Sequence, residues 1–191
     1  MNQLLLKCRC GTVKGSLSNV SPDMGSHIKC YCEDCRAFAN HIAPDEEILD
    51  EFGATEIFQS APWNLTITDG IDQLECLRLT NKGLRRWYAK CCNTPVANTI
   101  KADLPFLGIV HSFIDKGDNY EQLVGPIIGH YKLKGAIGDV PADIKKMGMP
   151  LKVTLQIVWR LLKCKFTMKG KSNIFFTADG KTITKAIILN E

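Results

Sequence analysis

Seven of the nine cysteines in this 191-residue chain fall into three short clusters, and this spacing constrains the chain more than any other feature of its sequence. The clusters are Cys8 with Cys10, then Cys30 with Cys32 and Cys35, then Cys91 with Cys92, while Cys76 and Cys164 stand alone. Disulfide pairing would leave one thiol over, and clustered thiols in a reducing compartment are typical of metal sites. The clusters therefore predict bound metal, and the two single cysteines are expected to be core thiols.

The composition predicts a globular chain, because 45% of the residues are hydrophobic and 23% are charged. No stretch of the sequence approaches the roughly 18 apolar residues that a membrane-spanning helix requires. The apolar run at residues 4–6 is too short for a secretory signal, so the expected compartment is the cytoplasm.

Charge is distributed unevenly along the chain. Residues 1–140 hold 14 Lys and Arg against 17 Asp and Glu, whereas residues 141–191 hold 10 against 3. A basic end of this kind is typical of a segment that contacts an acidic partner, an anionic lipid or a nucleic acid, or of a solvated Lys-rich surface. The solvated surface is the favoured interpretation, and no nucleic-acid partner is expected.

Short segments separated by turn residues predict a mainly β domain over residues 1–125. Strands are expected at residues 3–8, 12–17, 26–30, 55–59, 65–68, 73–80, 84–90 and 104–114. Helices are expected at residues 33–41 and 45–52, the second opening with acidic residues that suit a helix N-terminus.

The composition changes near Gly125, where Gly and Pro residues predict a connecting segment that leads into a basic C-terminal extension, residues 126–191. Apolar residues at helical spacing predict a helix over residues 151–166. A helix this widely apolar is expected to be buried, against the β domain or against a second subunit in a homodimer. Its basic strip also allows contact with a membrane surface. Residues 173–176 and 181–189 are expected to form a closing hairpin.

The second cluster has the pattern C-x-C-x-x-C, formed by Cys30, Cys32 and Cys35. Three thiolates can occupy one face of a tetrahedral zinc ion and leave the fourth position open, as in catalytic sites. Three thiolates and one Zn²⁺ carry one net negative charge, so the ion activates water poorly and is better suited to hold an incoming thiol as its thiolate.

A second metal set would join distant segments, Cys8 and Cys10 with Cys91 or Cys92. A metal ion there would fix the first hairpin to a turn more than 80 residues later, which suits a small β domain. The alternative is that Cys8 and Cys10 are small buried residues at the end of a strand.

The three cysteine motifs occur in the order of a known family. Cys8-Arg9-Cys10-Gly11, then C-x-C-x-x-C followed by Arg36, then Gly83-x-x-Arg86-x-Tyr88 before a cysteine turn, resembles the glutathione-dependent formaldehyde-activating enzymes, whose domain is shared by centromere protein V. The resemblance covers residues 4–115, and the whole chain looks most like an uncharacterised bacterial branch of that superfamily.

The resemblance implies a β-tent fold of antiparallel sheets with two zinc sites. It places a catalytic zinc on Cys30, Cys32 and Cys35, and a structural zinc on Cys8, Cys10 and a C-x-x-C-G pair. It also implies a carbon–sulfur lyase activity that joins formaldehyde to glutathione as S-hydroxymethylglutathione.

The chain departs from the family pattern at the last motif. Ala89 stands where the family has the first cysteine of the pair, and Asn93 stands where the family has glycine. Asparagine tolerates the left-handed conformation, so the turn can be retained. Adjacent residues of an extended chain point to opposite sides, so Cys91 and Cys92 do not readily bind one ion. The site is therefore expected to hold three thiolates and another ligand, to use both cysteines in an irregular turn, or to be empty; Cys92 is the favoured ligand and Cys91 its substitute.

Arginine binds carboxylates through two parallel hydrogen bonds, so Arg36 and Arg86, with Arg85 beside them, are candidates to bind a glutathione-like ligand. His27 is the nearest candidate for an additional metal ligand, and His111 is expected to lie in the core.

Three functions are compatible with these features. The leading hypothesis is an enzyme in which zinc on Cys30, Cys32 and Cys35 holds a small thiol that adds to a small aldehyde. The alternative is a zinc-stapled binding module without catalysis. The third hypothesis is redox sensing by Cys91 and Cys92. It is weaker than the other two, because a disulfide between adjacent cysteines closes a strained ring.

Overall fold

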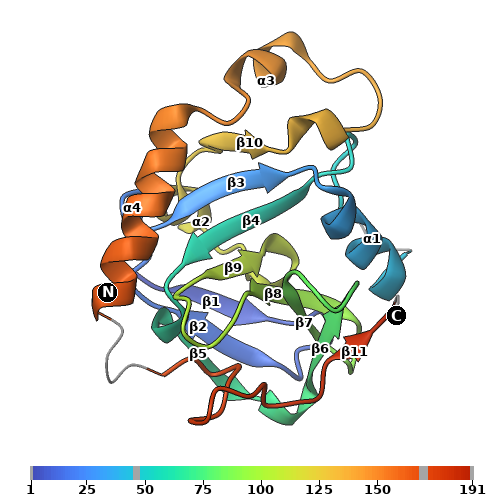
Figure 1. The fold of residues 1–191 in the computed structure, drawn as a ribbon, viewed down its shortest axis with the longest axis vertical. Coiled ribbons are helices and arrows are strands. Elements are labelled where there is room, and N and C mark those ends of the chain that lie inside the picture. Colours follow the sequence, from blue (N-terminus) through green and yellow to red (C-terminus); the bar gives the residue numbers. More distant parts are fainter. Residues whose placement is uncertain (1, 45–47, 168–171, 190–191) are drawn as a thin grey trace.

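The computed structural model of the protein describes residues 2–44, 48–167 and 172–189, and its framework is built from β-sheets (Figure 1). The strands are β1 (Leu4–Lys7), β2 (Lys14–Leu17), β3 (Ser26–Cys30), β4 (Thr55–Ser60), β5 (Leu65–Asp69), β6 (Leu74–Arg78), β7 (Arg85–Ala89), β8 (Thr94–Thr99), β9 (Leu107–Val110), β10 (Gly129–Tyr131) and β11 (Ile187–Ile188). The α-helices are α1 (Glu33–Ile42), α2 (Tyr120–Val124), α3 (Ala142–Met147) and α4 (Leu151–Thr167). Short 3-10 turns occur at η1 (Pro62–Asn64), η2 (Ile71–Gln73), η3 (His111–Phe113) and η4 (Leu133–Gly135).

Two sheets form the framework. The smaller sheet has the strand order β1-β2-β5 and is antiparallel throughout. The larger sheet has the order β10-β3-β4-β9-β8-β7-β6-β11, and its six inner strands pair antiparallel. The expectation of a mainly β fold with antiparallel sheets, short helices and a C-terminal helix is therefore confirmed.

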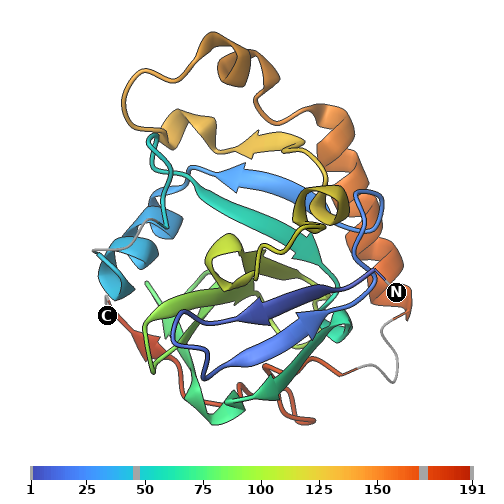
Figure 2. The ribbon, with the colours of Figure 1, turned by 180° about the vertical axis from the view of Figure 1, so that it is seen from behind.

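The C-terminal segment supplies both edges of the larger sheet. At one edge β10 pairs parallel with β3, and at the other β11 pairs parallel with β6. Figures 1 and 2 show this segment running from β10, over α3 and α4, and around to β11 at the far edge. The strands β10 and β11 thus cover the edges of β3 and β6, which would otherwise expose unpaired backbone groups.

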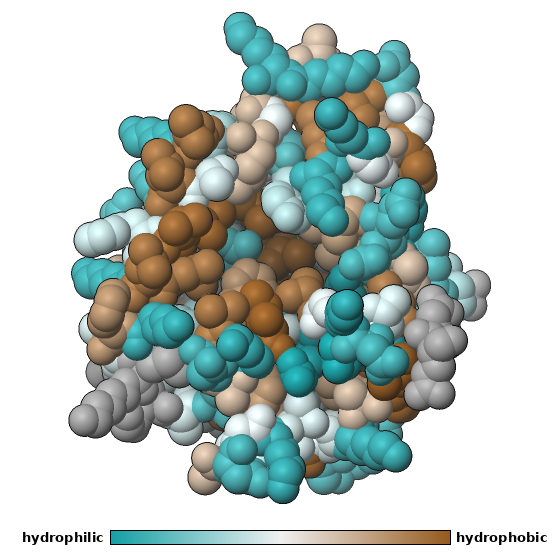
Figure 3. Space-filling model, viewed as in Figure 1, coloured by the Kyte–Doolittle hydropathy of each residue, from teal (hydrophilic) through white to brown (hydrophobic). Residues whose placement is uncertain are grey.

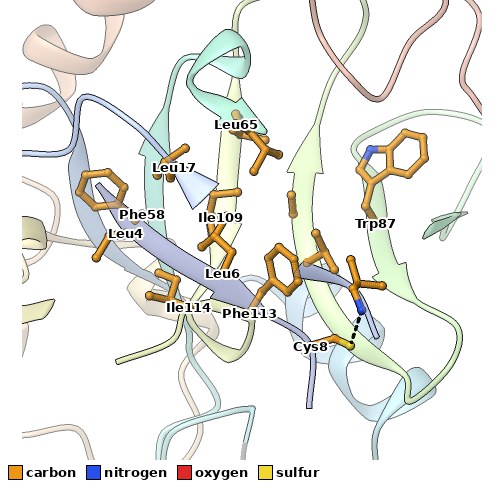
Figure 4. Packing of buried hydrophobic residues seen from close by; sticks show 14 of the residues in the cluster. Leu4, Leu6, Cys8, Leu17, Phe58, Leu65, Trp87, Ile109, Phe113 and Ile114 are labelled. Atoms are coloured by element: carbon orange, nitrogen blue, oxygen red, sulfur yellow. Dashed lines mark hydrogen bonds between the residues drawn. The ribbon is translucent and has the colours of Figure 1, made fainter. Parts of the chain in front are cut away.

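The main core lies between the two sheets. In β1, Leu4 and Leu6 are buried while Leu5 is exposed, which is the alternation expected of a strand with one face on a core. Figure 4 shows these side chains pointing toward Phe58 and Phe113, which are also fully or almost fully buried.

Trp87 anchors the other end of this core. Its ring stacks on Phe175 at 4.5 Å between centroids, and its indole nitrogen donates a hydrogen bond to the Thr99 hydroxyl (2.9 Å). A buried indole needs such a partner for its N–H group. Phe175 comes from the C-terminal segment, which therefore contributes to the core as well as to the sheet edges.

Two predicted elements differ from the structure. The buried strand predicted at residues 104–114 is shorter: β9 covers only Leu107–Val110 and is followed by η3. The helix predicted at residues 45–52 falls partly outside the described residues. At residues 48–52 the chain instead forms a bridge between Leu49 and Thr55, and the Asp50 carboxylate accepts hydrogen bonds from backbone N–H groups of the following turn.

The predicted C-terminal hairpin is present only near its turn. An isolated antiparallel bridge joins Phe176 and Thr182, and the Thr177 N–H donates to the Lys181 carbonyl (2.8 Å). The end of the predicted second strand, Ile187–Ile188, instead pairs with β6 of the larger sheet as β11. The strand β10 was not predicted, since its three residues lie in a segment rich in Gly and Pro.

The helix predicted at residues 151–166 is present as α4, but the expectation that it is buried within this chain was wrong. No residue of α4 is buried, and one face points to solvent. The exposed apolar residues of that face are Leu151, Leu155, Val158, Trp159, Leu162 and Phe166. No helix in the described parts of the chain combines the length and apolarity needed to cross a bilayer.

Candidate metal centres

The junction between β3 and α1 brings Cys30, Cys32 and Cys35 together. Cys30 is the last residue of β3, Cys32 is the N-cap of α1, and Cys35 lies in the first helical turn. The sulfur of Cys30 is 3.3 Å from that of Cys32 and 3.6 Å from that of Cys35, and all three residues are buried. A strand that ends directly at a helix N-terminus therefore folds the C-x-C-x-x-C motif into one compact triad.

The triad matches the geometry of a thiolate metal site. Sulfurs that bind tetrahedral zinc at 2.3 Å lie about 3.8 Å from one another, and the observed separations of 3.3 and 3.6 Å need only a small expansion. Within the described residues, no fourth Cys, His, Asp or Glu belongs to this group. The described residues thus offer three ligands at this site, and a tetrahedral ion bound there would have one position open.

Positive charge and backbone dipoles surround the triad. The Cys32 sulfur accepts a hydrogen bond from the Cys35 backbone N–H (3.4 Å) at the N-terminus of α1, an end that favours anionic groups. Arg86, only 2% exposed, lies with its Nη1 3.5 Å from the Cys35 sulfur. Hydrogen bonds from Cys30 and then Cys35 lower the pKa of Cys32, whereas sharing the proton with Cys32 raises the pKa of Cys30.

Three further contacts hold Arg86 in position. Its Nη1 also lies 3.4 Å from the Asn98 Oδ1 atom, and its Nη2 lies 3.8 Å from the Asp34 carboxylate. Its guanidinium stands over the Phe38 ring at 5.6 Å. Arg86 is therefore a buried cation held beside the thiol triad, and its charge can balance the net negative charge of three thiolates and one divalent ion.

A cavity of about 580 Å³ opens onto the triad. Its size lies within the range of sites for small molecules. One end is formed by Cys30, Cys32, Cys35, Arg86 and Asn98, and residues of α4 form part of the opposite wall. Figure 3 shows a hollow beside α4 with an apolar floor.

Residues of the C-terminal segment contact the backbone next to the triad. The Tyr31 backbone N–H donates to the Tyr131 carbonyl (2.9 Å), which extends the pairing of β3 with β10 to the residue before Cys32. Gly135 packs so closely that a Cβ atom there would lie 2.4 Å from the Tyr31 carbonyl oxygen. The loop that carries Cys32 is therefore held by the C-terminal segment.

The second cluster contains four cysteines rather than three. The sulfurs of Cys8, Cys10, Cys91 and Cys92 all lie within 4.8 Å of one another. The Cys91 sulfur is 3.4 Å from that of Cys10, 3.8 Å from that of Cys8 and 3.8 Å from that of Cys92. Four sulfurs at about 3.8 Å are the arrangement of a closed tetrahedral site.

An irregular turn brings both adjacent cysteines to this cluster. The Cys92 backbone N–H bonds back to the Ala89 carbonyl (3.2 Å), and Asn93 adopts a left-handed conformation with φ of 55°. The chain is thus not extended at Cys91 and Cys92, so the opposite orientation of neighbours in a strand does not apply. Of the three arrangements open from the sequence, the structure has both cysteines in an irregular turn.

Hydrogen bonds tie the two distant turns together. The Arg9 backbone N–H donates to the Thr94 hydroxyl (3.1 Å), and the Arg9 side chain donates to the Cys92 carbonyl (2.9 Å). The buried Cys8 sulfur accepts from the Val13 N–H (3.2 Å; Figure 4). The Thr12 hydroxyl lowers the pKa of Cys10 to about 6, while burial raises the pKa of Cys91 to about 12.

The other predicted site residues lie in different places. Arg86 lines the cavity, but Arg36 lies on α1, donates to the Gly135 carbonyl (2.8 Å), and is not among the described residues that form the cavity wall. Arg85 donates to the Ile100 carbonyl and stands over the Phe176 ring.

Neither of the two histidines considered from the sequence reaches a thiol cluster. His27 bonds to the Gly125 carbonyl (2.7 Å) and to Glu56 (2.9 Å). His111 faces the Glu56 backbone carbonyl (3.3 Å), and burial lowers its pKa. Cys76 is a fully buried core thiol as expected, whereas Cys164 is only half-buried on α4.

Sequence reasoning missed the cavity wall contributed by the C-terminal segment. The residues concerned are Tyr131, Lys132, Met149, Thr154, Ile157, Val158 and Leu161. The sequence signal for this wall was the width of the apolar face of α4. That face is wider than packing against a single sheet requires, which indicates a second apolar contact.

Comparison with known proteins identifies the family of the chain. No curated protein matches the chain. The sequence model of a family of unknown function, DUF6151, matches residues 1–185, a range that includes all three cysteine clusters and α4. The chain therefore belongs to this family of unknown function.

Proposed function

We propose that this protein binds two zinc ions, one structural and one that serves addition of a small thiol to an aldehyde. The observation that carries the proposal is the difference between its two thiol clusters. Cys8, Cys10, Cys91 and Cys92 form a complete set of four, whereas Cys30, Cys32 and Cys35 form a set of three that faces a cavity. Closed sets are typical of structural zinc, and open sets are typical of catalytic zinc.

The chemistry of the ligands supports a thiol as the reactant. Zinc bound to three thiolates would hold an incoming thiol as its thiolate, and would polarise water only weakly. The sequence resemblance to formaldehyde-activating enzymes agrees with this chemistry, although the argument from ligand charge does not depend on it. The reaction is then the reversible formation of a hemithioacetal, which is a carbon–sulfur lyase chemistry.

The bond changes balance without an oxidant or a reductant. The thiolate sulfur attacks the aldehyde carbon, a C–S bond forms, and the C=O π electrons move to oxygen. The proton that left the thiol ends on that oxygen, which gives RS–CH(OH)R′. Asn98, buried beside Arg86, supplies an amide group that can donate a hydrogen bond to the developing oxyanion. Arg86 balances the charge of the thiolates beside the reacting sulfur.

The competing function, a zinc-stapled binding module, requires protein ligands at every coordination position. The second cluster meets that requirement, but the first does not among the described residues. A structural ion also needs no cavity of about 580 Å³ beside it. The geometry therefore favours the enzyme.

The experiment is to measure how fast the zinc-loaded protein interconverts formaldehyde, a small thiol and their adduct, by NMR exchange at equilibrium. Wild type should accelerate the exchange, and Cys32→Ser should abolish the acceleration. Cys164→Ser, outside both clusters, is the matched control and should retain it. Wild-type protein that carries two zinc ions and leaves the exchange rate at its uncatalysed value would contradict the proposal.

A further inference from the structure

The cavity at the thiol triad is unusual for a site that would take glutathione. Three isoleucines from the sheet and its connections, Ile28, Ile57 and Ile100, line it together with Phe106 and Met149. The inner face of α4 adds Ile157, Val158 and Leu161. Apolar side chains thus form most of the enclosure away from the thiols.

The charges in the cavity do not suit a ligand with two carboxylates and an ammonium group. Arg86 is already shared among Cys35, Asn98 and Asp34, and only 2% of it is exposed. Among the described residues of the cavity wall, Lys132 is the remaining cation, and it lies at the exposed surface. A glutathione molecule would therefore place at least one carboxylate against apolar side chains, which is costly.

We infer that the open thiol site takes a reactant with an apolar chain, either a medium-chain aldehyde or an alkyl thiol, rather than a peptide thiol. This inference rests on the proposed function for the reacting group, but the apolar selectivity comes from the cavity wall alone. The reacting end lies at Cys30, Cys32 and Cys35, and the chain extends toward Ile157 and Leu161 of α4. The C-terminal segment, which builds this wall, is thus the specificity element of the site.

Calorimetric titration with primary alcohols isolates the cavity from the metal chemistry. The affinity of the wild-type protein should rise from 1-butanol through 1-hexanol to 1-octanol, by up to about fourfold for each added methylene that becomes buried. Ile157→Asn should flatten the series, whereas Leu155→Asn, on the exposed face of the same helix, should leave it unchanged. A wild-type affinity that does not depend on chain length would overturn the inference, whatever the variants do.

Thiol ligands then separate this inference from the proposed function. Zinc-loaded protein should bind 1-hexanethiol more tightly than 1-hexanol, and more tightly than glutathione by at least about tenfold. If the thiol binds no better than the alcohol while the alcohol series still rises, the apolar selectivity stands and the thiol chemistry fails. If glutathione binds more tightly than 1-hexanethiol, the apolar selectivity fails.

A separate observation concerns the exposed face of α4, which meets the cavity wall at Val158. The exposed apolar residues of this face form one stripe, which we call the outer stripe: Leu151, Leu155, Val158, Trp159, Leu162 and Phe166. Trp159 is 69% and Phe166 86% exposed. Positions three, four and seven apart lie on one side of a helix, so the stripe is continuous and roughly 100° wide.

Lysines flank the outer stripe on both sides. By helical spacing Lys152 and Lys163 lie along one border and Lys165 along the other, and all three are exposed. The helix contains no acidic residue. A second copy of α4 packed against this stripe would bring lysine against lysine, which is unfavourable in a symmetric contact. A bilayer with anionic headgroups has an apolar interior and a negatively charged boundary. It therefore matches both the apolar stripe and the flanking lysines.

The geometry points to an anionic lipid surface as the partner of the outer stripe, with α4 lying in the plane of the interface. In cosedimentation, the protein should bind vesicles that contain phosphatidylglycerol and should bind pure phosphatidylcholine much more weakly. High salt should reduce the binding, because the lysine contribution is screened. The double variant Trp159→Ser/Phe166→Ser should bind at least about tenfold more weakly, and Gln156→Ala, a polar exposed position of the same helix, should bind as wild type.

Sedimentation equilibrium provides the competing outcome. A stable dimer that the double variant dissociates, without vesicle binding by wild type, would overturn the lipid assignment in favour of a second copy. Absence of binding to both kinds of vesicle would overturn it as well. Cavity binding of alcohols is measured without lipid, so this result is independent of the first inference.

Discussion

The Nη1 atom of Arg86 lies 3.5 Å from the sulfur of Cys35, although 51 residues separate the two in the chain. Strand β7 carries the arginine and the first turn of α1 carries the cysteine, so the contact depends on the packing of α1 over the sheet. This pair places a fixed positive charge beside the thiol triad, and the first prediction follows from it.

Arg86→Met should weaken zinc binding at the triad. Three thiolates and a divalent ion would then carry an unbalanced negative charge in a buried site. Supporting residues around a metal typically contribute 10–100-fold in affinity, so a loss of about that size is expected. Competition with a chelator, followed by zinc analysis, measures it. The control is Arg85→Met on the same strand, whose guanidinium contacts Ile100 and Phe176 instead; equal losses in both variants would contradict the assigned role of Arg86.

The sequence predicts the thiol triad well, because its geometry is local. Cys30, Cys32 and Cys35 span one strand end and one helix start, and both elements were expected from nearby residues. The fold class was predictable for the same reason, because the alternation of apolar and polar residues that marks a β-strand extends over only a few residues. The cavity was not predictable, because residues such as Met149 and Leu161 reach it only through the three-residue strand β10 and the path of the C-terminal segment.

The second cluster shows a different limit. A strand-like reading of Cys91 and Cys92 places their side chains on opposite sides. The turn that unites them depends on Asn93 in a left-handed conformation, which the sequence allows but does not require. The outer stripe of α4 shows a third limit. Its apolar pattern predicts that this face packs against another surface, but the pattern does not reveal that the described residues leave it exposed.

Gly135→Ala should weaken metal binding at the triad by displacing the backbone next to Cys32. A Cβ atom at this position would lie 2.4 Å from the Tyr31 carbonyl oxygen, so the backbone before Cys32 must shift. Metal at the first cluster should therefore be lost at lower chelator concentration, while metal at the second cluster should be unaffected. Gly117→Ala is the control, because a Cβ atom there meets nothing within 4 Å. Retention of both metals at the wild-type level would show that the loop tolerates the displacement.

Removal of the second metal should cost stability rather than activity. A metal ion bound by Cys8, Cys10, Cys91 and Cys92 would fix two turns that are more than 80 residues apart. A ligand that binds only the folded state at 100 times its dissociation constant contributes about 2.7 kcal/mol. Cys91→Ala should therefore lower the free energy of unfolding in urea by at least about 2 kcal/mol. Cys10→Ala should do the same, and a cost confined to one of them would mean that the four thiols do not act as one site.

Glu56 should give the protein a distinct dependence on acid. Its carboxylate accepts from His27 (2.9 Å) and from the Tyr120 hydroxyl (2.6 Å). These bonds, the first above all, lower the pKa of Glu56 to about 2 from an ordinary value of 4.5. A carboxyl with a lowered pKa in the folded state stabilises the fold above its unfolded pKa, and that contribution is lost as the pH falls from about 4.5 toward 2.

Urea unfolding at a series of pH values tests this prediction against Glu56→Gln. The variant should lose on the order of 1–2 kcal/mol at neutral pH, after allowance for solvent screening, and the difference from wild type should shrink between pH 4.5 and 2. Comparison with the variant removes the effect of thiolate protonation, which both proteins share. Glu121→Gln, at an exposed position of α2, should not change the profile. A constant difference at every pH would contradict the assignment.

We propose two zinc ions per chain, one in a closed set of four cysteines and one in an open set of three. Elemental mass spectrometry of freshly purified wild type, Cys32→Ser and Cys91→Ala measures the number of zinc ions per chain. Wild type should contain about two zinc ions and each variant about one, with a different ion lost in each. If wild type contains one zinc ion and Cys32→Ser retains it, the triad beside the cavity holds no metal and the two-site proposal is wrong.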